Sequence, residues 1–417
     1  MKIKKGSFNL ITPALIILVS FVILVMRRPD IILHAQPWAE DGAVWMAGVY
    51  NNGFWSSLIL PQNGYYQTIS RLTYGFSLLF GLSNAALIAN AIAILIRCFF
   101  ICFILSKRMD FIDVKYRIFI CIYFMLMPNV AEGFVNITNA HWYLSMYLFS
   151  VVLSRDPSSK MEVVHDFTVL IISALSGPFV VFIAPCLLIK RIYLSNGFKC
   201  FFKSIKLFDV IMALCCIIQV TAILTTSEST RPESPLGYNF GLLANIISCR
   251  LIFGSLLPYD LARVASSYTY LNIAMLLLAL AAMALAFIKC SWRVKILILY
   301  PTLMIGFAMA RPVISMDNAQ WPMMLSTQSG ERYFYVTNIA FVCLMVGLLS
   351  LIKKYSGLLL GVVTISFLVM ASSYYKISPL PIVKYSEDVM KFNESNPGDV
   401  VNINILPPGW KMTLIKK

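Results

Sequence analysis

The residues with the clearest capacity for chemistry are two adjacent carboxylates, Glu40 and Asp41, in the segment 36–42. They follow the first long apolar segment of the chain after a short stretch. A carboxylate placed beside a membrane could act as a general base on a bound hydroxyl group. Acidic residues in the first turn of a helix also complement the helix dipole. The residues alone leave both interpretations open.

Arginines form a second candidate set, with Arg332 and Arg311 at the two ends of one polar segment. Arginine binds phosphate through two parallel hydrogen bonds and tolerates partial burial. Tyr333 follows Arg332 directly and joins it as a candidate for binding phosphate. The alternative is that these arginines reach the membrane interface and pair with local carboxylates. Arg97 lies inside an apolar segment, where a charged residue is a functional candidate by default.

A third candidate is the segment 132–142, in which polar side chains that form hydrogen bonds stand beside an aromatic residue. Such groups commonly hold sugars. The alternative is an aromatic belt with helix caps at a membrane boundary. Together with the first loop, this segment supplies the candidate residues for an acceptor or sugar, which are Trp38, Glu132, Asn139, His141 and Trp142.

The composition indicates what must position these residues. The 417-residue chain is 59% hydrophobic and 13% charged, with a mean hydropathy of +0.78. An average soluble domain is about one-quarter charged. Apolar segments near 18 residues indicate membrane spans. The composition excludes a soluble enzyme, a disordered chain and a disulfide scaffold, and it argues against a barrel, whose strands alternate in character.

The net charge and the spacing of the cysteines and histidines argue against a nucleic-acid-binding protein and against a metalloprotein. The net charge of +15 is typical of basic residues that flank membrane spans and meet anionic lipid, so we expect no nucleic-acid partner. The ten cysteines contain no CxxC pair, and the three histidines lack the HxxxH spacing. We therefore expect neither a metal nor a cofactor. The apolar run after Met-Lys-Ile-Lys-Lys, which no small-x-small cleavage site follows, is expected to be an uncleaved anchor.

We therefore expect an all-α polytopic membrane protein with about eleven transmembrane helices and amphipathic helices in its outer loops. Residues 1–375 would form the integral domain, with a first outer loop at 27–82, and residues 376–417 a short C-terminal tail. The amphipathic segments are 67–82 and 240–257. The expected spans are 8–26, 84–105, 117–130, 141–154, 166–176, 178–190, 207–225, 268–288, 294–310, 333–352 and 357–375.

Lysine positions predict the orientation of these spans. With the N-terminus in the cytoplasm, every lysine before residue 376 falls in an inner loop, as the distribution of positive charge in membrane proteins requires. An odd number of spans then places the C-terminal tail outside. The outer loops carry arginines only, and these need another explanation. They are Arg27, Arg28, Arg71, Arg231, Arg250, Arg263, Arg311 and Arg332.

With these residues in view, the chain resembles the polytopic C-type glycosyltransferases that use polyprenyl-phosphate sugars. More narrowly, it resembles the phage-borne serotype-converting O-antigen glucosyltransferases of enteric bacteria. The resemblance spans most of the chain, and its most specific element is the acidic pair in the first outer loop. Its other elements are Asn136–Trp142, the hairpin turn Ser176-Gly177-Pro178, Gly330–Tyr333 and the ending Pro407-Pro408-Gly409-Trp410.

The resemblance implies an inverting hexosyl transfer on the periplasmic face of a bacterial inner membrane, and so serotype conversion of lipopolysaccharide. The donor substrate would be undecaprenyl-phosphate glucose, and the acceptor a sugar of the O-antigen repeat unit. Either Glu40 or Asp41 would deprotonate the acceptor, and arginine would stabilise the departing phosphate. A lipid-sugar synthase and a flippase would act upstream.

Two other functions have similar compositions. A lipid-linked sugar flippase would place charged groups along a path at mid-membrane, whereas Arg97 is nearly the only such charge here. An O-antigen polymerase would depend on the outer arginines without needing the acidic pair. Replacement of Glu40 and Asp41 followed by an activity assay distinguishes the polymerase from the glycosyltransferase.

Overall fold

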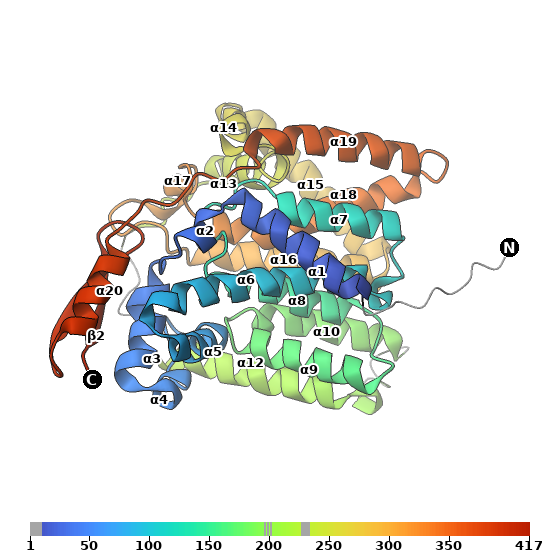
Figure 1. Ribbon diagram of the computed structural model, residues 1–417. Helices are drawn as coiled ribbons and strands as arrows, with labels where there is room; N and C mark the ends of the chain where they lie inside the picture. The colour runs from blue at the N-terminus through green and yellow to red at the C-terminus, as the bar shows by residue number, and fades with distance from the viewer. Residues whose placement is uncertain (1–10, 196, 198–199, 201, 227–233) are drawn as a thin grey trace.

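The computed structural model describes residues 11–195, 197, 200, 202–226 and 234–417 (Figure 1). The expectations placed on Lys2, Lys4, Lys5, Lys199 and Arg231 lie outside these described residues, as does the beginning of the first expected span.

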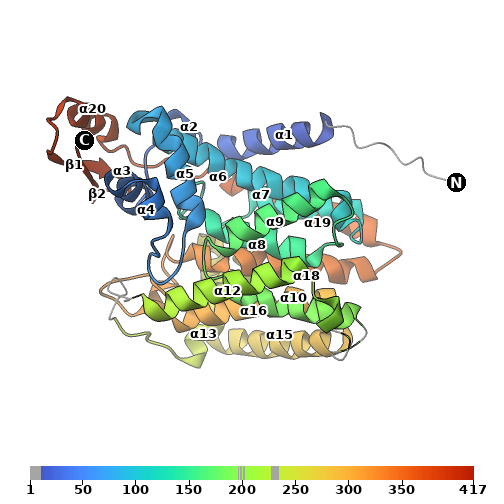
Figure 2. The ribbon, with the colours of Figure 1, turned by 90° about the horizontal axis from the view of Figure 1, so that it is seen from below.

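The described chain is mostly helical, and its long helices lie side by side between two ends of the molecule (Figures 1 and 2). Each expected span contains a helix, because each is a continuous apolar run. The helices are α1 (Ile11–Arg27), α6 (Leu82–Leu105), α7 (Val114–Leu126), α8 (Ala140–Leu153), α9 (Lys160–Ala174), α10 (Val180–Leu194), α12 (Leu207–Thr225), α15 (Thr269–Lys289), α16 (Trp292–Ala310), α18 (Tyr335–Leu351) and α19 (Ser356–Tyr374).

Within the described residues, six helical segments are long and apolar enough to cross a membrane. They are α6, α12, α15, α16, Glu331–Leu351 and α19. Helices α7, α9 and α10 have 13, 15 and 15 residues. At about 1.5 Å per residue they reach roughly 20–23 Å, less than a hydrocarbon core about 30 Å thick. The structure therefore supports a membrane protein with six such helices, and the expected count of eleven depends on the shorter ones.

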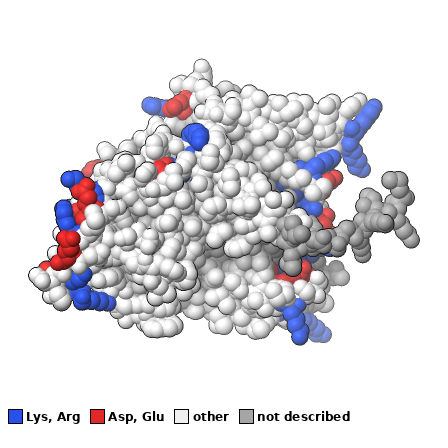
Figure 3. Space-filling model, in the orientation of Figure 1, with Lys and Arg blue, Asp and Glu red and all other residues white. Residues whose placement is uncertain are grey.

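Charged side chains gather at the two ends of the bundle, and the face between them is almost free of charge in Figure 3. Loops at one end, here called the lysine end, comprise residues 106–113, 154–159, 290–291 and 352–355. The opposite end, here called the loop end, comprises residues 28–81, 127–139, 175–179, 311–334 and the C-terminal segment. An uncharged band between charged ends is what a membrane-embedded bundle requires.

The loop end is built of short helices. The first outer loop contains α2 (Asp30–Leu33), a π-helix η1 (Asp41–Met46), α3 (Ala47–Asn52), α4 (Phe54–Leu58), α5 (Thr68–Ser77) and the 3₁₀ turn η2 (Leu78–Phe80). Later parts contain α13 (Phe240–Ile247), the π-helix η5 (Ser248–Ile252), α14 (Tyr259–Ala262), η6 (Arg263–Ser267), α17 (Gln320–Met323) and the 3₁₀ turn η7 (Glu331–Phe334). Both segments expected to be amphipathic contain helix, in α5 and α13. The 3₁₀ turns η3 (Lys107–Met109) and η4 (Phe202–Ser204) lie outside this end.

The expected tail is a folded unit, and it departs from the all-α expectation. It contains α20 (Tyr385–Glu394) and an antiparallel hairpin of β1 (Val400–Ile405) and β2 (Trp410–Ile415), in which Ile403 faces Met412. Apolar residues alternate with polar ones along both strands, so one face is buried. That face packs against η1 and α3 of the first outer loop (Figure 2).

The turn at Ser176-Gly177-Pro178 joins α9 to α10. Gly177 has a φ of +141°, a conformation that a residue with a side chain rarely adopts. Both arms are longer than expected, and both pack against α8 and α12. One face of each arm is buried, which agrees with the expectation of a hairpin held among neighbours.

Candidate active site

A cavity of about 460 Å³ lies at the loop end, where segments distant in sequence converge. The first outer loop contributes Trp38 and Glu40. The loop between α7 and α8 and the start of α8 contribute Glu132, Asn139, His141 and Trp142, and the segment between α16 and α18 contributes Arg311, Arg332 and Tyr333. The candidate residues for the base, the phosphate and the sugars, except Asp41, therefore line one cavity. Arg97 does not line it: this arginine is buried, donates to the Gly133 carbonyl at 2.8 Å and lies over the ring of Tyr143.

The two adjacent carboxylates have different surroundings. Asp41 is 1% exposed, and its carboxylate accepts hydrogen bonds from the backbone N–H groups of Thr138 at 2.8 Å and Ile137 at 3.2 Å. Burial raises the pKa of Asp41 well above its ordinary value, although these hydrogen bonds act in the opposite direction. Glu40 is partly exposed and lines the cavity. Asp41 can therefore hold the backbone at Ile137 and Thr138 in place, whereas Glu40 can contact a ligand in the cavity.

Local backbone geometry causes this separation. Ala39 has a φ of +45°, which is uncommon for a residue with a side chain. The N–H group of Ala39 donates a hydrogen bond to the carbonyl of Leu406. The N–H group of Leu406 in turn donates to the carbonyl of Pro37 at 3.0 Å. Asp41 then begins the π-helix η1, a type of element frequent at functional sites. Gly42 allows η1 to pack closely against Ile405 of β1, because a Cβ atom at position 42 would lie only 2.7 Å from Ile405 Cδ1.

The loop between α7 and α8 is held from several sides. Trp45 Nε1 donates to Thr138 Oγ1 at 3.1 Å, and Gln67 Nε2 donates to the Thr138 carbonyl at 3.2 Å. Asn136 Oδ1 accepts from Asn139, from the backbone N–H at 3.1 Å and from Nδ2 at 2.7 Å. Together with Asp41, these bonds place Asn139 and the beginning of α8 at the cavity wall.

Arg332 and Glu132 form an ion pair across the cavity wall. Arg332 Nη1 donates to Glu132 Oε1, and the backbone N–H of Arg332 donates to Oε2 at 3.2 Å. Arg332 Nη2 also donates to the Val313 carbonyl at 2.7 Å, and the guanidinium lies 4.9 Å from the centre of the Tyr333 ring. A guanidinium has five N–H donors, so this one keeps capacity for a further anion. Glu40 acts electrostatically on the same arginine.

Aromatic rings form another wall. Phe179 stacks on His141 with ring centroids 5.3 Å apart and contacts Trp142 at 4.8 Å. Trp142 also meets the edge of Tyr333 at 5.7 Å, and Tyr65 lies 6.3 Å from His141. Sequence reasoning did not assign Phe179 to the site, although its position directly after the hairpin turn at the outer face was a usable signal.

Two buried polar atoms at this wall carry particular weight. Among the described residues, none provides a hydrogen-bond partner for Trp142 Nε1 or Gln67 Oε1. Most buried polar groups in proteins are paired, so exceptions call for an explanation. Both residues line the cavity, one as a donor and the other as an acceptor. Hydroxyl groups can serve both as acceptors for the indole N–H group and as donors to the amide oxygen.

Apolar side chains from the first turn of α10 and the last two turns of α16 form a further part of the lining. Phe182 from α10 meets Phe307 from α16 at 5.3 Å, and Met304 and Ala308 of α16 lie beside them. On the other side, Pro407 and Trp410 of the C-terminal unit reach the cavity. The site thus combines acidic, basic, aromatic and apolar surfaces. Within the described ranges, no group of three or more His, Cys, Asp or Glu side chains is placed to hold a metal ion.

No protein-family model matches the chain, and no curated protein matches it either.

Proposed function

We propose that the protein is an inverting glycosyltransferase that transfers a hexose, glucose in the favoured case, from a polyprenyl-phosphate sugar to a sugar hydroxyl of an O-antigen acceptor. The observation that carries the proposal is the placement of Glu40 and Arg332 on one cavity, with an apolar surface of α10 and α16 in its lining. Transfer from a lipid-linked donor would use all three: the carboxylate for the acceptor hydroxyl, the guanidinium for the phosphate and the apolar surface for the lipid chain.

Glu40 is the general base in this proposal. Its carboxylate takes the proton of the acceptor hydroxyl as that oxygen attacks the anomeric carbon. The bond between the anomeric carbon and the phosphate oxygen breaks, and the polyprenyl phosphate leaves with its bonding electrons. Attack from the face opposite the phosphate inverts the anomeric configuration.

Arg332 stabilises the charge that develops on the departing phosphate. Its guanidinium is oriented by Glu132 and by the Val313 carbonyl, so little reorganisation is required when the donor binds. Arg311 lines the same cavity. The prenyl chain would follow the apolar side chains of α10 and α16. The aromatic wall of His141, Trp142 and Phe179 would hold sugar rings.

This function places the loop end on the periplasmic side of a bacterial inner membrane and the lysine end in the cytoplasm. Such an orientation follows from the distribution of lysine before residue 376. The donor would reach the site after a lipid-sugar synthase and a flippase have acted.

The test is a transfer assay with the protein in membranes, polyprenyl-phosphate glucose and lipopolysaccharide. We expect glucose on the purified lipopolysaccharide, and its loss in Glu40→Gln. A polymerase would instead change the distribution of O-antigen chain lengths without adding a hexose to each repeat. A flippase would give no product when donor and acceptor are both accessible in detergent. Either of these outcomes would replace the proposal.

A further inference from the structure

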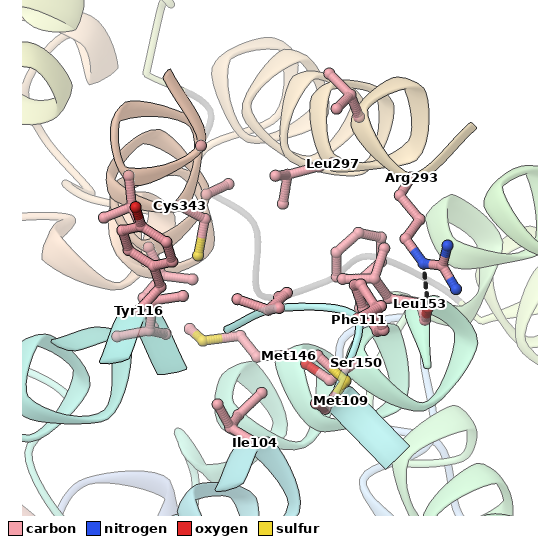
Figure 4. A pocket seen from close by; sticks show the side chains of 18 of the residues that line it. Ile104, Met109, Phe111, Tyr116, Met146, Ser150, Leu153, Arg293, Leu297 and Cys343 are labelled. Atoms are coloured by element: carbon pink, nitrogen blue, oxygen red, sulfur yellow. Dashed lines mark hydrogen bonds between the residues drawn. The ribbon is translucent and has the colours of Figure 1, made fainter. Parts of the chain in front are cut away.

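A second cavity of about 460 Å³ lies between α6, α7, α8, α16 and α18, toward the lysine end (Figure 4). It belongs to none of the surfaces described above and shares no lining residue with the candidate active site. Its walls are mainly apolar, with Ile104, Met146, Leu297 and Cys343 among the side chains that face it in Figure 4. Its volume lies within the range of about 300–1,000 Å³ typical of ligand pockets.

Charge is concentrated at one rim of this cavity, at Arg293 near the start of α16. The guanidinium lies 4.0 Å from the ring centre of Phe111 and 4.5 Å from that of Trp292, and Nε donates to the Leu153 carbonyl at 3.4 Å. Among the described residues, no ion pair with Arg293 is formed within 4.0 Å. The charged group that acts on it is another cation, Arg155.

The acidic residue on the lining has a different task. Asp113 precedes α7, and its carboxylate accepts a hydrogen bond from the backbone N–H of Lys115 at 3.2 Å. It therefore caps the helix and is exposed to solvent. Arg155 is paired with Asp110 at 2.8 Å. The cavity thus has an apolar interior and a rim where Arg293 offers an uncompensated positive charge to an anion.

We propose that this cavity holds an acyl chain of an anionic membrane phospholipid, with the lipid phosphate at Arg293. The apolar walls of this cavity are chemically suited to a hydrocarbon chain. Basic pockets between transmembrane helices bind anionic headgroups. Arginine can engage a phosphate with two hydrogen bonds while its ring contacts persist. The proposal is independent of the glycosyltransferase function, because it uses another cavity, whose charged rim lies toward the opposite end of the bundle.

Gly347 provides a variant that fills the cavity. It lies on α18, lines the cavity, and a Cβ atom placed there would meet nothing within 4 Å. Gly347→Leu therefore occupies the space of the acyl chain without a clash at Cβ. Gly361 on α19 is the matched control, since its Cβ would also meet nothing within 4 Å and it lies outside the cavity. Both changes exchange glycine for leucine in an apolar helix.

Arg293→Gln tests the headgroup contact while leaving the cavity walls in place. Lys353→Gln is its control, because Lys353 is an exposed cation at the same end of the bundle and does not line the cavity. Arg293→Gln also keeps the proposal testable if Gly347→Leu is not recovered in folded form.

The experiment is native mass spectrometry of the full-length protein in detergent, with added phosphatidylglycerol or phosphatidylcholine of identical acyl chains. We expect one tightly retained phosphatidylglycerol and weaker retention of phosphatidylcholine. Gly347→Leu should lower the affinity at least tenfold. Arg293→Gln should lower it about fivefold, the factor expected for one basic residue at an anionic surface. Both controls should match the wild-type protein.

Thermal unfolding provides a second measurement. Added phosphatidylglycerol should raise the midpoint temperature of the wild type and of both controls, and should leave Gly347→Leu unchanged. The proposal is overturned if Gly347→Leu retains and responds to phosphatidylglycerol as Gly361→Leu does. It is equally overturned if the two lipids bind alike and Arg293→Gln has no effect on either.

Discussion

The carboxylate of Asp41 accepts a 2.8 Å hydrogen bond from the backbone N–H of Thr138, which is 97 residues distant in sequence. Through this bond Asp41 joins the first outer loop to the segment that begins α8. Its neighbour Glu40 faces the cavity instead. Adjacent residues on a helix point about 100° apart, so the two carboxylates cannot share one proton of a substrate. The structure thereby distinguishes Glu40, the candidate base, from Asp41, which positions the backbone beside it.

Amide replacements should affect these two positions unequally. Glu40→Gln keeps the shape of the side chain and removes its basicity, so we expect the transfer rate to fall by roughly 10²–10⁴-fold with unchanged stability. Asp41→Asn places an NH₂ group against one of the two N–H donors, those of Ile137 and Thr138, so we expect the free energy of unfolding to fall by about 1–3 kcal/mol and the rate per folded molecule to fall less than in Glu40→Gln. Transfer assays in membranes and thermal unfolding in detergent measure the two effects.

Two results would contradict this division of roles. Wild-type rates in both amide variants, made in normal amounts, would exclude the acidic pair from catalysis. A large loss of rate in Asp41→Asn, with full activity in Glu40→Gln, would exchange the two roles and would require Asp41 to become accessible when substrate binds.

The stability contributed by Asp41 should decrease as the pH rises. Burial raises its pKa in the folded protein above the ordinary value of 3.8, so the folded state binds the proton more tightly than the unfolded state. This contribution is complete below pH 3.8 and is lost as the pH rises through the raised pKa. The free energy of unfolding of the wild type, minus that of Asp41→Asn, should therefore decrease with rising pH. Between pH 3.8 and the raised pKa, the decrease should be about 1.4 kcal/mol per pH unit. Thermal unfolding of both proteins from pH 4 to 8 measures the narrowing, and a difference that widens with pH would contradict it.

Arg332→Lys should raise the donor concentration needed for half-maximal rate by about tenfold, because lysine keeps the charge and loses the planar fork. Arg263→Lys is the control, since Arg263 is an exposed arginine in η6 that does not line the cavity.

Glu132→Gln should weaken donor binding, because it removes the carboxylate that orients the guanidinium of Arg332. The double variant should then lose less than the sum of the single losses. Additive losses would mean that Glu132 does not act through Arg332.

Reporter fusions test the proposed orientation. An alkaline phosphatase joined after Lys417 should be active in a Gram-negative host, because the C-terminal unit lies at the loop end. The same reporter joined after Ser158, at the lysine end, should be inactive. The opposite pattern would place the candidate active site in the cytoplasm and remove the periplasmic acceptor from the proposal.

The apolar runs predicted the long helices because each run is long enough to determine its own element. Glu40, Glu132 and Arg332 were also named as candidates, because they are charged residues in the segments that connect such runs. The arrangement of these three residues relative to one another was not predicted. Glu132 was assigned to a sugar and Arg332 to a phosphate, whereas the structure pairs the two across 200 residues. A contact at that separation leaves no periodic trace in a sequence.

The different orientations of Glu40 and Asp41 depend on the positive φ of Ala39 and on its bond to Leu406, which lies more than 360 residues away. The C-terminal hairpin did leave a local signal. Isoleucine alternates with asparagine from Asn402 to Ile405, and Pro-Pro-Gly follows at 407–409. The signal covers only one short strand, so it was outweighed by the helical character of the rest of the chain.

Trp410 at the rim of the cavity should contribute to binding of the acceptor, because it begins β2 on the outer side, where a lipopolysaccharide chain would approach. It is 41% exposed and lines the cavity. Trp410→Ala should raise the acceptor concentration for half-maximal rate by about 5–30-fold, the effect of losing roughly 1–2 kcal/mol at a binding hot spot. The donor requirement and the unfolding temperature should change little. Trp55→Ala is the matched control, since Trp55 on α4 is 77% exposed and lies outside the cavity. Equal effects of the two variants on acceptor kinetics would show that the C-terminal unit serves only to hold the first outer loop in place.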